Sequence, residues 1–268
     1  MNKTILFGAI AGALAVSATG AWAICADVKR SDLNQAIGAA AGAAAATGGY
    51  GLPMWVTVVD ETGKICHIAT SGTPGRFAGN SEWLGSRIIS AQKANTANAF
   101  SLDNYVISTA NLYSTVQPGG SLYGLQHSNP VNAAAAYLGN PNKYGTPGDP
   151  LNNKRIGGVN VFGGGLALYK DGKKIGAVGV SGDTSCRDHA NAWRIREALG
   201  MHPTPPIVGI TTSNMDASGA VQAPLAGAAK GDEMILTGTG GYWDAWSHPA
   251  CPNSAPAVSS ANGTLQAP

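Results

Sequence analysis

The chain has 268 residues, of which 44% are hydrophobic and 12% are charged. This is the composition of a globular protein with enough apolar side chains for one sizeable core, alone or with appendages. The formal net charge is +2 and no basic stripe runs along the sequence, so nucleic acid is not an expected partner.

Residues 1–23 have the pattern of a secretory signal peptide. Lys3 precedes an apolar run over residues 5–16, and the segment ends in an A-x-A cleavage pattern. A lipoprotein signal is disfavoured because the bulky Ile24 stands directly before Cys25. No later segment is apolar over the length needed to cross a membrane, so we expect a periplasmic or secreted protein with no membrane span after signal removal.

The four cysteines suit an oxidising compartment. They show no C-x-x-C spacing of the kind used for metal binding or redox catalysis, so two disulfides are predicted. Three pairings are possible and the sequence does not choose between them. The candidates are Cys25, Cys66, Cys186 and Cys251.

The first predicted elements are a helix and a hairpin. Ser31 and Asp32 are capping residues before an alanine-rich helix over residues 33–46, which two glycines end. Two apolar runs then follow, at residues 54–60 and 64–70, separated by a short turn with a glycine. This pattern predicts an antiparallel pair of strands.

Two further helices are predicted in the middle of the chain. The first covers residues 82–100 after an Asn-Ser cap, and the second covers residues 102–113 after Ser101. The next stretch, residues 117–160, is rich in Gly, Pro and Asn. An insertion of that length is typically either functional or disordered.

A second hairpin and a last helix complete the predicted domain. Strands at residues 166–169 and 174–180 are joined through an Asp-Gly dipeptide that favours a tight hairpin turn. A cap within residues 183–185 then begins a helix that ends near Gly200.

The order helix, hairpin, two helices, insertion, hairpin, helix predicts an α+β fold, with an antiparallel sheet flanked by helices over residues 24–202. Residues 203–268 are rich in Pro, Gly, Ser and Thr and read as a C-terminal extension. Trp243, Trp246 and Cys251 indicate that part of this extension docks on the domain.

Three motifs in this order resemble the GlcG/HbpS-type family of haem-binding, haem-degrading proteins, which is related to the C-terminal domain of some cobalamin adenosyltransferases. They are VTVVDETGK at residues 56–64, SAQKANTANAF at 90–100 and FGGGLALYKDGKKIGAVGVSGDTSCRD at 162–188. The resemblance covers residues 31–200, apart from the insertion, and leaves the extension unexplained. It implies a profilin-like or PAS-like sandwich, a homo-oligomer and a haem cofactor.

The resemblance suggests four side chains for a haem site, which needs cations for the propionates and an axial ligand. Lys93 and Arg87 share one predicted helix and are candidates for the propionates. Thr96 and His127 are candidate iron ligands, from the same helix and from the insertion. The structural alternatives are a Lys whose aliphatic stem is buried, a Thr bonded back to its own helix and an ordinary loop histidine.

The second hairpin is rich in glycine. Gly163, Gly164 and Gly165 precede one strand, and Gly176 and Gly179 lie in the next. Because glycine has no Cβ, these positions could bring the backbone close to a flat ligand or to a neighbouring subunit, and the three consecutive glycines are candidate cofactor contacts. The alternative is a bent strand packed tightly under the alanine-rich helices.

Two enzyme motifs are excluded. The three glycines lead into a strand, whereas a dinucleotide-binding loop opens a helix. The run GVSGD has Asp183 where a nucleophile elbow needs glycine. His189 and His67 have no metal-ligand spacing and read as structural.

The sequence thus favours an exported haem-binding protein that sequesters, senses or slowly degrades haem. Whether it is an enzyme is left open, because no dedicated acid-base pair stands out and any haem breakdown would use the cofactor's own chemistry. Two alternatives stay open. One is a non-catalytic small-molecule or corrinoid-binding module; the other is a periplasmic accessory or assembly protein that docks through its aromatic extension at residues 242–246.

Overall fold

The structure is a computed structural model that describes residues 23–42, 49–74, 83, 85–210, 230–236, 246–252 and 264–265. The predicted signal peptide lies outside these residues, except for Ala23, which begins helix α1 (Ala23–Asp27). Among the helices of the described part, none has the length and apolar character required to span a membrane.

A four-stranded antiparallel sheet forms the centre of the fold, in the order β2-β1-β5-β4. The strands are β1 (Trp55–Asp60), β2 (Ile65–Thr70), β4 (Gly165–Lys170) and β5 (Lys173–Ser181). Both predicted hairpins are therefore confirmed. The two hairpins join through β1 and β5, which pair with Trp55 opposite Ser181. These two central strands are buried almost throughout because helices cover both faces of the sheet.

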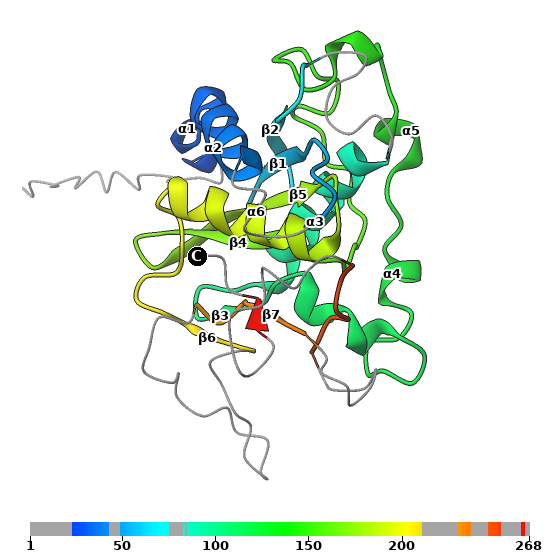
Figure 1. Cartoon of the computed structure of the whole chain (residues 1–268), viewed down its shortest axis with the longest axis vertical. Coiled ribbons are helices and arrows are strands. Elements are labelled where there is room, and N and C mark those ends of the chain that lie inside the picture. The colour runs from blue at the N-terminus through cyan, green and yellow to red at the C-terminus, as the bar shows by residue number, and fades with distance from the viewer. Residues whose placement is uncertain are drawn as a thin grey trace, which may run out of the picture.

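The two faces bury different helices (Figure 1). Alternate β1 residues such as Val56 and Val58 pack with α1, α2 (Arg30–Gly42) and α6 (Ser185–Ala198). Trp55 and Val59 point the other way and pack with α3 (Ser86–Phe100). This period of two is what a strand covered on both faces requires, and the predicted α+β fold with flanking helices is confirmed.

Two helix starts differ from their predictions. Helix α2 begins at Arg30, so Ser31 and Asp32 lie in its first turn instead of before it. The predicted end at residue 46 falls on 43–48, outside the described residues. Helix α3 begins at Ser86, and its predicted Asn-Ser cap also lies outside the described part.

The predicted helix over residues 102–113 is wrong. This segment contains the short strand β3 (Tyr105–Val106) and a 3-10 turn at Ala110–Leu112, followed by another at Ser114–Val116. The amide oxygen of Asn111 accepts hydrogen bonds from both the backbone N–H and the hydroxyl of Ser108, at 2.9 and 2.8 Å. Such local side-chain bonds offer the backbone an alternative to the helix.

The insertion at residues 117–160 is part of the packed structure, and Figure 1 shows it in green along one side of the molecule. It carries the short helices α4 (Leu125–Ser128) and α5 (Ala133–Ala136) and a 3-10 turn at Pro141–Lys143. Its Leu151 and Ile156 belong to the α3 side of the core.

The described parts of the C-terminal extension dock on the domain. Strand β6 (Val208–Gly209) pairs in parallel with β3, and β7 (Met234–Ile235) pairs with β8 (Thr264–Leu265). Trp246 packs in a cluster that includes Val161. Trp243 lies outside the described residues.

Two disulfides form, as predicted, and the structure gives their pairing. Cys25–Cys66 joins α1 to β2, and Cys186–Cys251 joins the first turn of α6 to the C-terminal extension.

The glycines of the second hairpin permit close packing within the protein. A Cβ at Gly179 would overlap Ser90 O and Ala94 N of α3, and one at Gly176 would overlap Val59 O of β1. The space beside these strand glycines is therefore filled by the protein's own backbone, which agrees with the tight-packing alternative.

The three consecutive glycines are packed in the same way. A Cβ at Gly163 would meet Ser185 O, one at Gly164 would meet Val180 O, and one at Gly165 would meet the Thr109 side chain. The sequence interpretation allowed a flat ligand or a neighbouring subunit to approach these glycines, whereas the structure fills the space beside them with the protein's own atoms.

Candidate functional site

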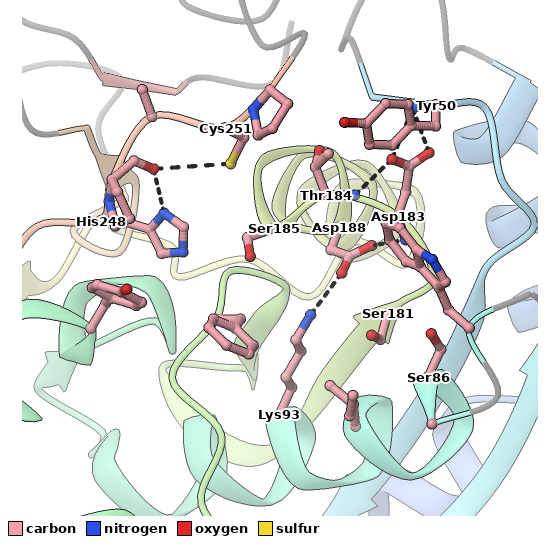
Figure 2. A pocket seen from close by; sticks show the side chains of 18 residues that line it. Tyr50, Ser86, Lys93, Ser181, Asp183, Thr184, Ser185, Asp188, His248 and Cys251 are labelled. Carbon is pink, nitrogen blue, oxygen red and sulfur yellow. Dashed lines mark hydrogen bonds and ion pairs between the residues drawn. The ribbon is translucent and has the colours of Figure 1, made fainter.

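A cavity of about 610 Å³ lies between α3, the turn from β5 to α6 and the C-terminal segment 246–252 (Figure 2). This volume is within the range of small-molecule sites, about 300–1,000 Å³. Its walls are largely apolar and aromatic, and the apolar side chains include Trp83, Ile89, Tyr113, Phe162 and Pro249. Hydroxyl groups of Ser86, Ser181 and Ser185 also line it.

A buried ion pair forms part of the wall. Lys93 Nζ lies 2.8 Å from Asp188 Oδ2 and donates a hydrogen bond to Val180 O at 3.0 Å. The Lys93 side chain is 1% exposed and that of Asp188 is 3% exposed. Burial raises the pKa of Asp188 to about 6, and the nearby Lys93 ammonium opposes this shift. The pair ties α3 to α6 beneath the cavity, as Figure 2 shows.

Asp183 organises the loop next to this pair, and its backbone N–H donates to Asp188 Oδ1 at 3.0 Å. Its carboxylate accepts backbone N–H bonds from Tyr50 at 2.9 Å, Leu52 at 3.0 Å and Thr184 at 2.7 Å. Thr184 is the N-cap of α6 and accepts a hydrogen bond from Arg187 N. Because these oxygens already have several donors, Asp183 positions the loop and has little capacity left for an external ligand.

His248 enters the cavity wall from the C-terminal segment and is 3% exposed. Its Nδ1 lies 2.7 Å from Pro249 O, while Nε2 is buried with no hydrogen-bond partner among the described residues. Burial lowers the pKa of His248 to about 4. In Figure 2 the imidazole projects toward the same space as Lys93 and Ser185.

The sequence analysis missed His248. The signal that could have found it is its position three residues before Cys251, since a disulfide there fixes the surrounding segment against the domain. Pairing was open among three arrangements, so the neighbourhood of Cys251 could not be assigned from the sequence.

The structure brings one of the four predicted site side chains, Lys93, to the cavity. Arg87 is buried in an ion pair with Asp149 of the insertion and also donates to Ala136 O. It does not line the cavity, and the carboxylate of Asp149 already compensates its charge.

Thr96 and His127 are also elsewhere. Thr96 donates to Gln92 O at 2.8 Å, as a helix-interior threonine usually does, and accepts from Asn160 N at 3.0 Å. His127 is exposed on α4. Neither residue lines the cavity, and neither do Gly163, Gly164 and Gly165.

The ligand atoms of Cys186, His248 and Cys251 lie within 4.8 Å of one another. A metal ion bound there would need cysteine thiolates. The two sulfurs are bonded to each other, so the oxidised protein offers the imidazole but no thiolate.

His189, on α6, makes a specific contribution to acid sensitivity. It is 1% exposed and both ring nitrogens lack partners among the described residues. Burial, with smaller effects from Arg196, His248 and Lys93, lowers its pKa to about 3. Between pH 6.5 and 3 the unfolded chain therefore binds a proton that the folded protein does not, so the free energy of unfolding falls as the pH falls, by about 1.4 kcal/mol per pH unit.

Replacing His189 by leucine should remove this effect. On going from pH 7 to pH 5, the wild type should lose about 2 kcal/mol more of its unfolding free energy than His189→Leu does. Urea unfolding at both pH values measures the difference. His248 contributes with the same sign and Asp188 with the opposite sign, but both are present in each protein. Equal pH dependence in the two proteins would contradict the prediction.

Comparison with curated proteins finds a relative in Citrobacter freundii, an uncharacterized 15.0 kDa protein in the dhaT-dhaS intergenic region. The two sequences are 36% identical over 100 residues, which is 37% of this chain and 49% of the relative. The chain thus spans about half the length of this curated relative.

The solved structures that are similar to this chain include three of the same fold. A PduOC:heme complex is 24% identical, with 64% of this chain and 91% of the other covered and a TM-score of 0.43. Klebsiella pneumoniae protein ORFY is 25% identical, with 65% of this chain and 90% of the other covered and a TM-score of 0.41. A double mutant of Streptomyces reticuli HbpS is 18% identical, with 74% of this chain and 99% of the other covered and a TM-score of 0.43.

The family comparison covers most of the domain. Residues 30–195 match the family described as haem degrading protein HbpS-like, from the start of α2 into α6. The match includes all the strands of the central sheet, and it ends before the C-terminal segment that carries His248. The chain therefore belongs to the haem-degrading HbpS-like family.

Proposed function

We propose that this protein binds haem in the 610 Å³ cavity between α3, α6 and the C-terminal segment. The observation that carries the proposal is the lining of this cavity: aromatic and aliphatic side chains surround a space of the right size class, in a chain of a haem-degrading family. Flat apolar ligands gain free energy by leaving water for such a site.

The residues present fit haem in two respects. Trp83, Tyr113 and Phe162 supply apolar surface for a macrocycle, and His248 Nε2 is a buried nitrogen that has no hydrogen-bond partner in the described part of the chain. Lys93 is the one lysine or arginine among the described lining residues, and Asp188 already neutralises it. The hydroxyl groups of Ser86, Ser181 and Ser185 would be the remaining donors available to the propionates.

Haem supplies the redox chemistry when it is bound, and the protein supplies the surroundings. The apolar walls would shield the part of the macrocycle that they contact from water. The Lys93–Asp188 pair is buried and hydrogen-bonded, so it holds α3 and α6 at a fixed separation. No free acid-base pair lines the described part of the cavity, which favours sequestration, sensing or slow degradation over rapid turnover.

The proposal includes export to the periplasm or the exterior. It is supported by the signal-like segment at residues 1–23 and by two disulfides, which are typical of oxidising compartments. A homo-oligomer is also part of the proposal, and light scattering on the purified mature chain tests it.

The test is a titration of the mature protein with hemin, followed by the Soret band. We expect a saturable shift at one haem per chain. Ser185 lines the cavity at the start of α6, so Ser185→Trp should fill the cavity and raise the dissociation constant at least about tenfold, equivalent to 1.4 kcal/mol.

Ser128→Trp is the matched control, because Ser128 is exposed on α4 and does not line the cavity. No saturable change in the wild type would overturn haem binding. Unaltered binding by a folded Ser185→Trp would place haem outside this cavity. A parallel titration with hydroxocobalamin tests the corrinoid alternative.

A further inference from the structure

We propose that His248 Nε2 is the axial ligand of the haem iron, and that the Cys186–Cys251 disulfide holds the ligand-bearing segment 246–252 against the cavity. This inference rests on the proposed function and adds to it the identity of the iron ligand. It also gives a role to a part of the chain that lies beyond the family match at residues 30–195.

The first argument is the hydrogen bonding of the imidazole. A neutral imidazole has one N–H and one nitrogen with a free lone pair. Pro249 O can only accept, and it lies 2.7 Å from Nδ1 of His248, so the proton resides on Nδ1 and the lone pair on Nε2. A backbone carbonyl bonded to one ring nitrogen is the usual way in which a protein orients a histidine whose other nitrogen binds metal.

The second argument is the cost of the arrangement without a ligand. Nε2 is buried and has no hydrogen-bond partner among the described residues. A buried acceptor left unsatisfied costs about 1–3 kcal/mol. Because the residue also lines the cavity, a metal centre bound there would use the lone pair that has no partner among the described residues.

The third argument is that the backbone around His248 is held at several points. Ser247 exchanges two bonds with Ser114, through Ser114 N to Ser247 O at 3.1 Å and Ser247 N to Ser114 Oγ at 3.0 Å. His248 N donates to Ile235 O at 2.8 Å. Three residues later the chain is covalently fixed to α6 by the Cys186–Cys251 disulfide. Because the chain is fixed both before and after His248, the imidazole is positioned before haem binds. This lowers the entropy cost of binding.

The fourth argument is the shortage of other ligands in the same wall. His248 is the one histidine among the described lining residues, and the sulfur of Cys251 is bonded to Cys186. Lys93 is engaged with Asp188. The phenol of Tyr113 is the remaining competitor on this side, with its ring centroid 4.9 Å from that of His248.

The experiment compares hemin complexes of the full mature chain in five forms: wild type, His248→Ala, His248→Met, Tyr113→Phe and His127→Ala. Soret position, electron paramagnetic resonance of the ferric form and the hemin dissociation constant are measured for each. His127 is exposed and away from the cavity, so His127→Ala is the matched control and should behave as wild type.

We expect His248→Ala to change the spectrum and to weaken hemin binding at least about tenfold, since even the loss of a residue that only supports a ligand costs 10- to 100-fold in metal affinity. Added imidazole should restore the wild-type spectrum. His248→Met keeps a side chain of similar size and should give a thioether-ligated spectrum, because methionine also ligates haem iron. Circular dichroism confirms that each variant is folded.

A second arm tests the disulfide. The double variant Cys186→Ala/Cys251→Ala should lose the imidazole signature and bind hemin about tenfold more weakly. Cys25→Ala/Cys66→Ala removes the other disulfide, whose cysteines do not line the cavity, and should keep the signature. If Cys186→Ala/Cys251→Ala keeps the imidazole signature as Cys25→Ala/Cys66→Ala does, or if both double variants lose it, the role of the disulfide is overturned.

The outcomes separate the two proposals. If the wild type binds hemin and folded His248→Ala gives the same spectrum and affinity, the ligand assignment is overturned while haem binding stands. If Tyr113→Phe alone changes the spectrum, the ligand is Tyr113 and the assignment to His248 is also overturned. If the wild type shows no saturable binding, both proposals fail.

Discussion

Replacing Asp232 by alanine should destabilise the protein by about 3–5 kcal/mol, because it leaves a buried guanidinium without its counter-ion. Arg196 on α6 donates to both carboxylate oxygens of Asp232, at 2.6 and 2.9 Å, and also to Ala167 O at 3.3 Å. Both side chains are 0% exposed. Urea unfolding at neutral pH measures the loss.

A surface ion pair provides the control. Lys170 and Asp27 lie 2.8 Å apart, but their side chains are 49% and 26% exposed. Solvent screens such a pair, so Asp27→Ala should cost less than about 1 kcal/mol. The double variant Arg196→Met/Asp232→Leu should recover much of the lost stability, since it removes both buried charges. A cost for Asp232→Ala no larger than that for Asp27→Ala would contradict the prediction.

Gly179→Ala should destabilise the protein by about 3 kcal/mol or more, at the upper end of the costs of overpacking. The new Cβ would overlap two backbone atoms of α3, Ser90 O and Ala94 N, and backbone atoms cannot rotate away as a flexible side chain can. Helix α3 would have to move off the sheet. Thermal and urea unfolding measure the effect.

Gly38→Ala is the matched control with the opposite expected sign. Gly38 lies within α2, and no atom of the described residues would come within 4 Å of its Cβ. Alanine is a better helix former than glycine by about 1 kcal/mol, so this change should stabilise the protein. A folded Gly179→Ala with wild-type stability would show that α3 can yield at the contact.

The sequence predicted the elements whose signals are local. Both hairpins follow from short apolar segments joined by turns that contain glycine, and α6 follows from a cap within residues 183–185, which the structure places at Thr184. The segment at residues 102–113 was mispredicted because Ser108 and Asn111 bond to each other, a preference that helix periodicity does not reveal.

The candidate site could be predicted only in part. Lys93 was found because it stands within a family motif, but the motif gives no sign that Asp188 already neutralises it. Arg87 was chosen because it shares the predicted helix with Lys93, and the sequence likewise gives no sign that Asp149 of the insertion already pairs with it. The position of His248 in the cavity wall depends on the Cys186–Cys251 disulfide, which joins residues 65 positions apart. A single sequence does not specify which cysteines pair.

The docking of the extension has a practical consequence for dissecting this protein. A fragment that stops at residue 202, near the family boundary, would keep Arg196 in the interior while discarding Asp232, and would leave Cys186 as an unpaired thiol. The cooperative folding unit is therefore longer than the family domain. Expression trials of shortened forms should retain the chain through residue 265, because β8 pairs with β7.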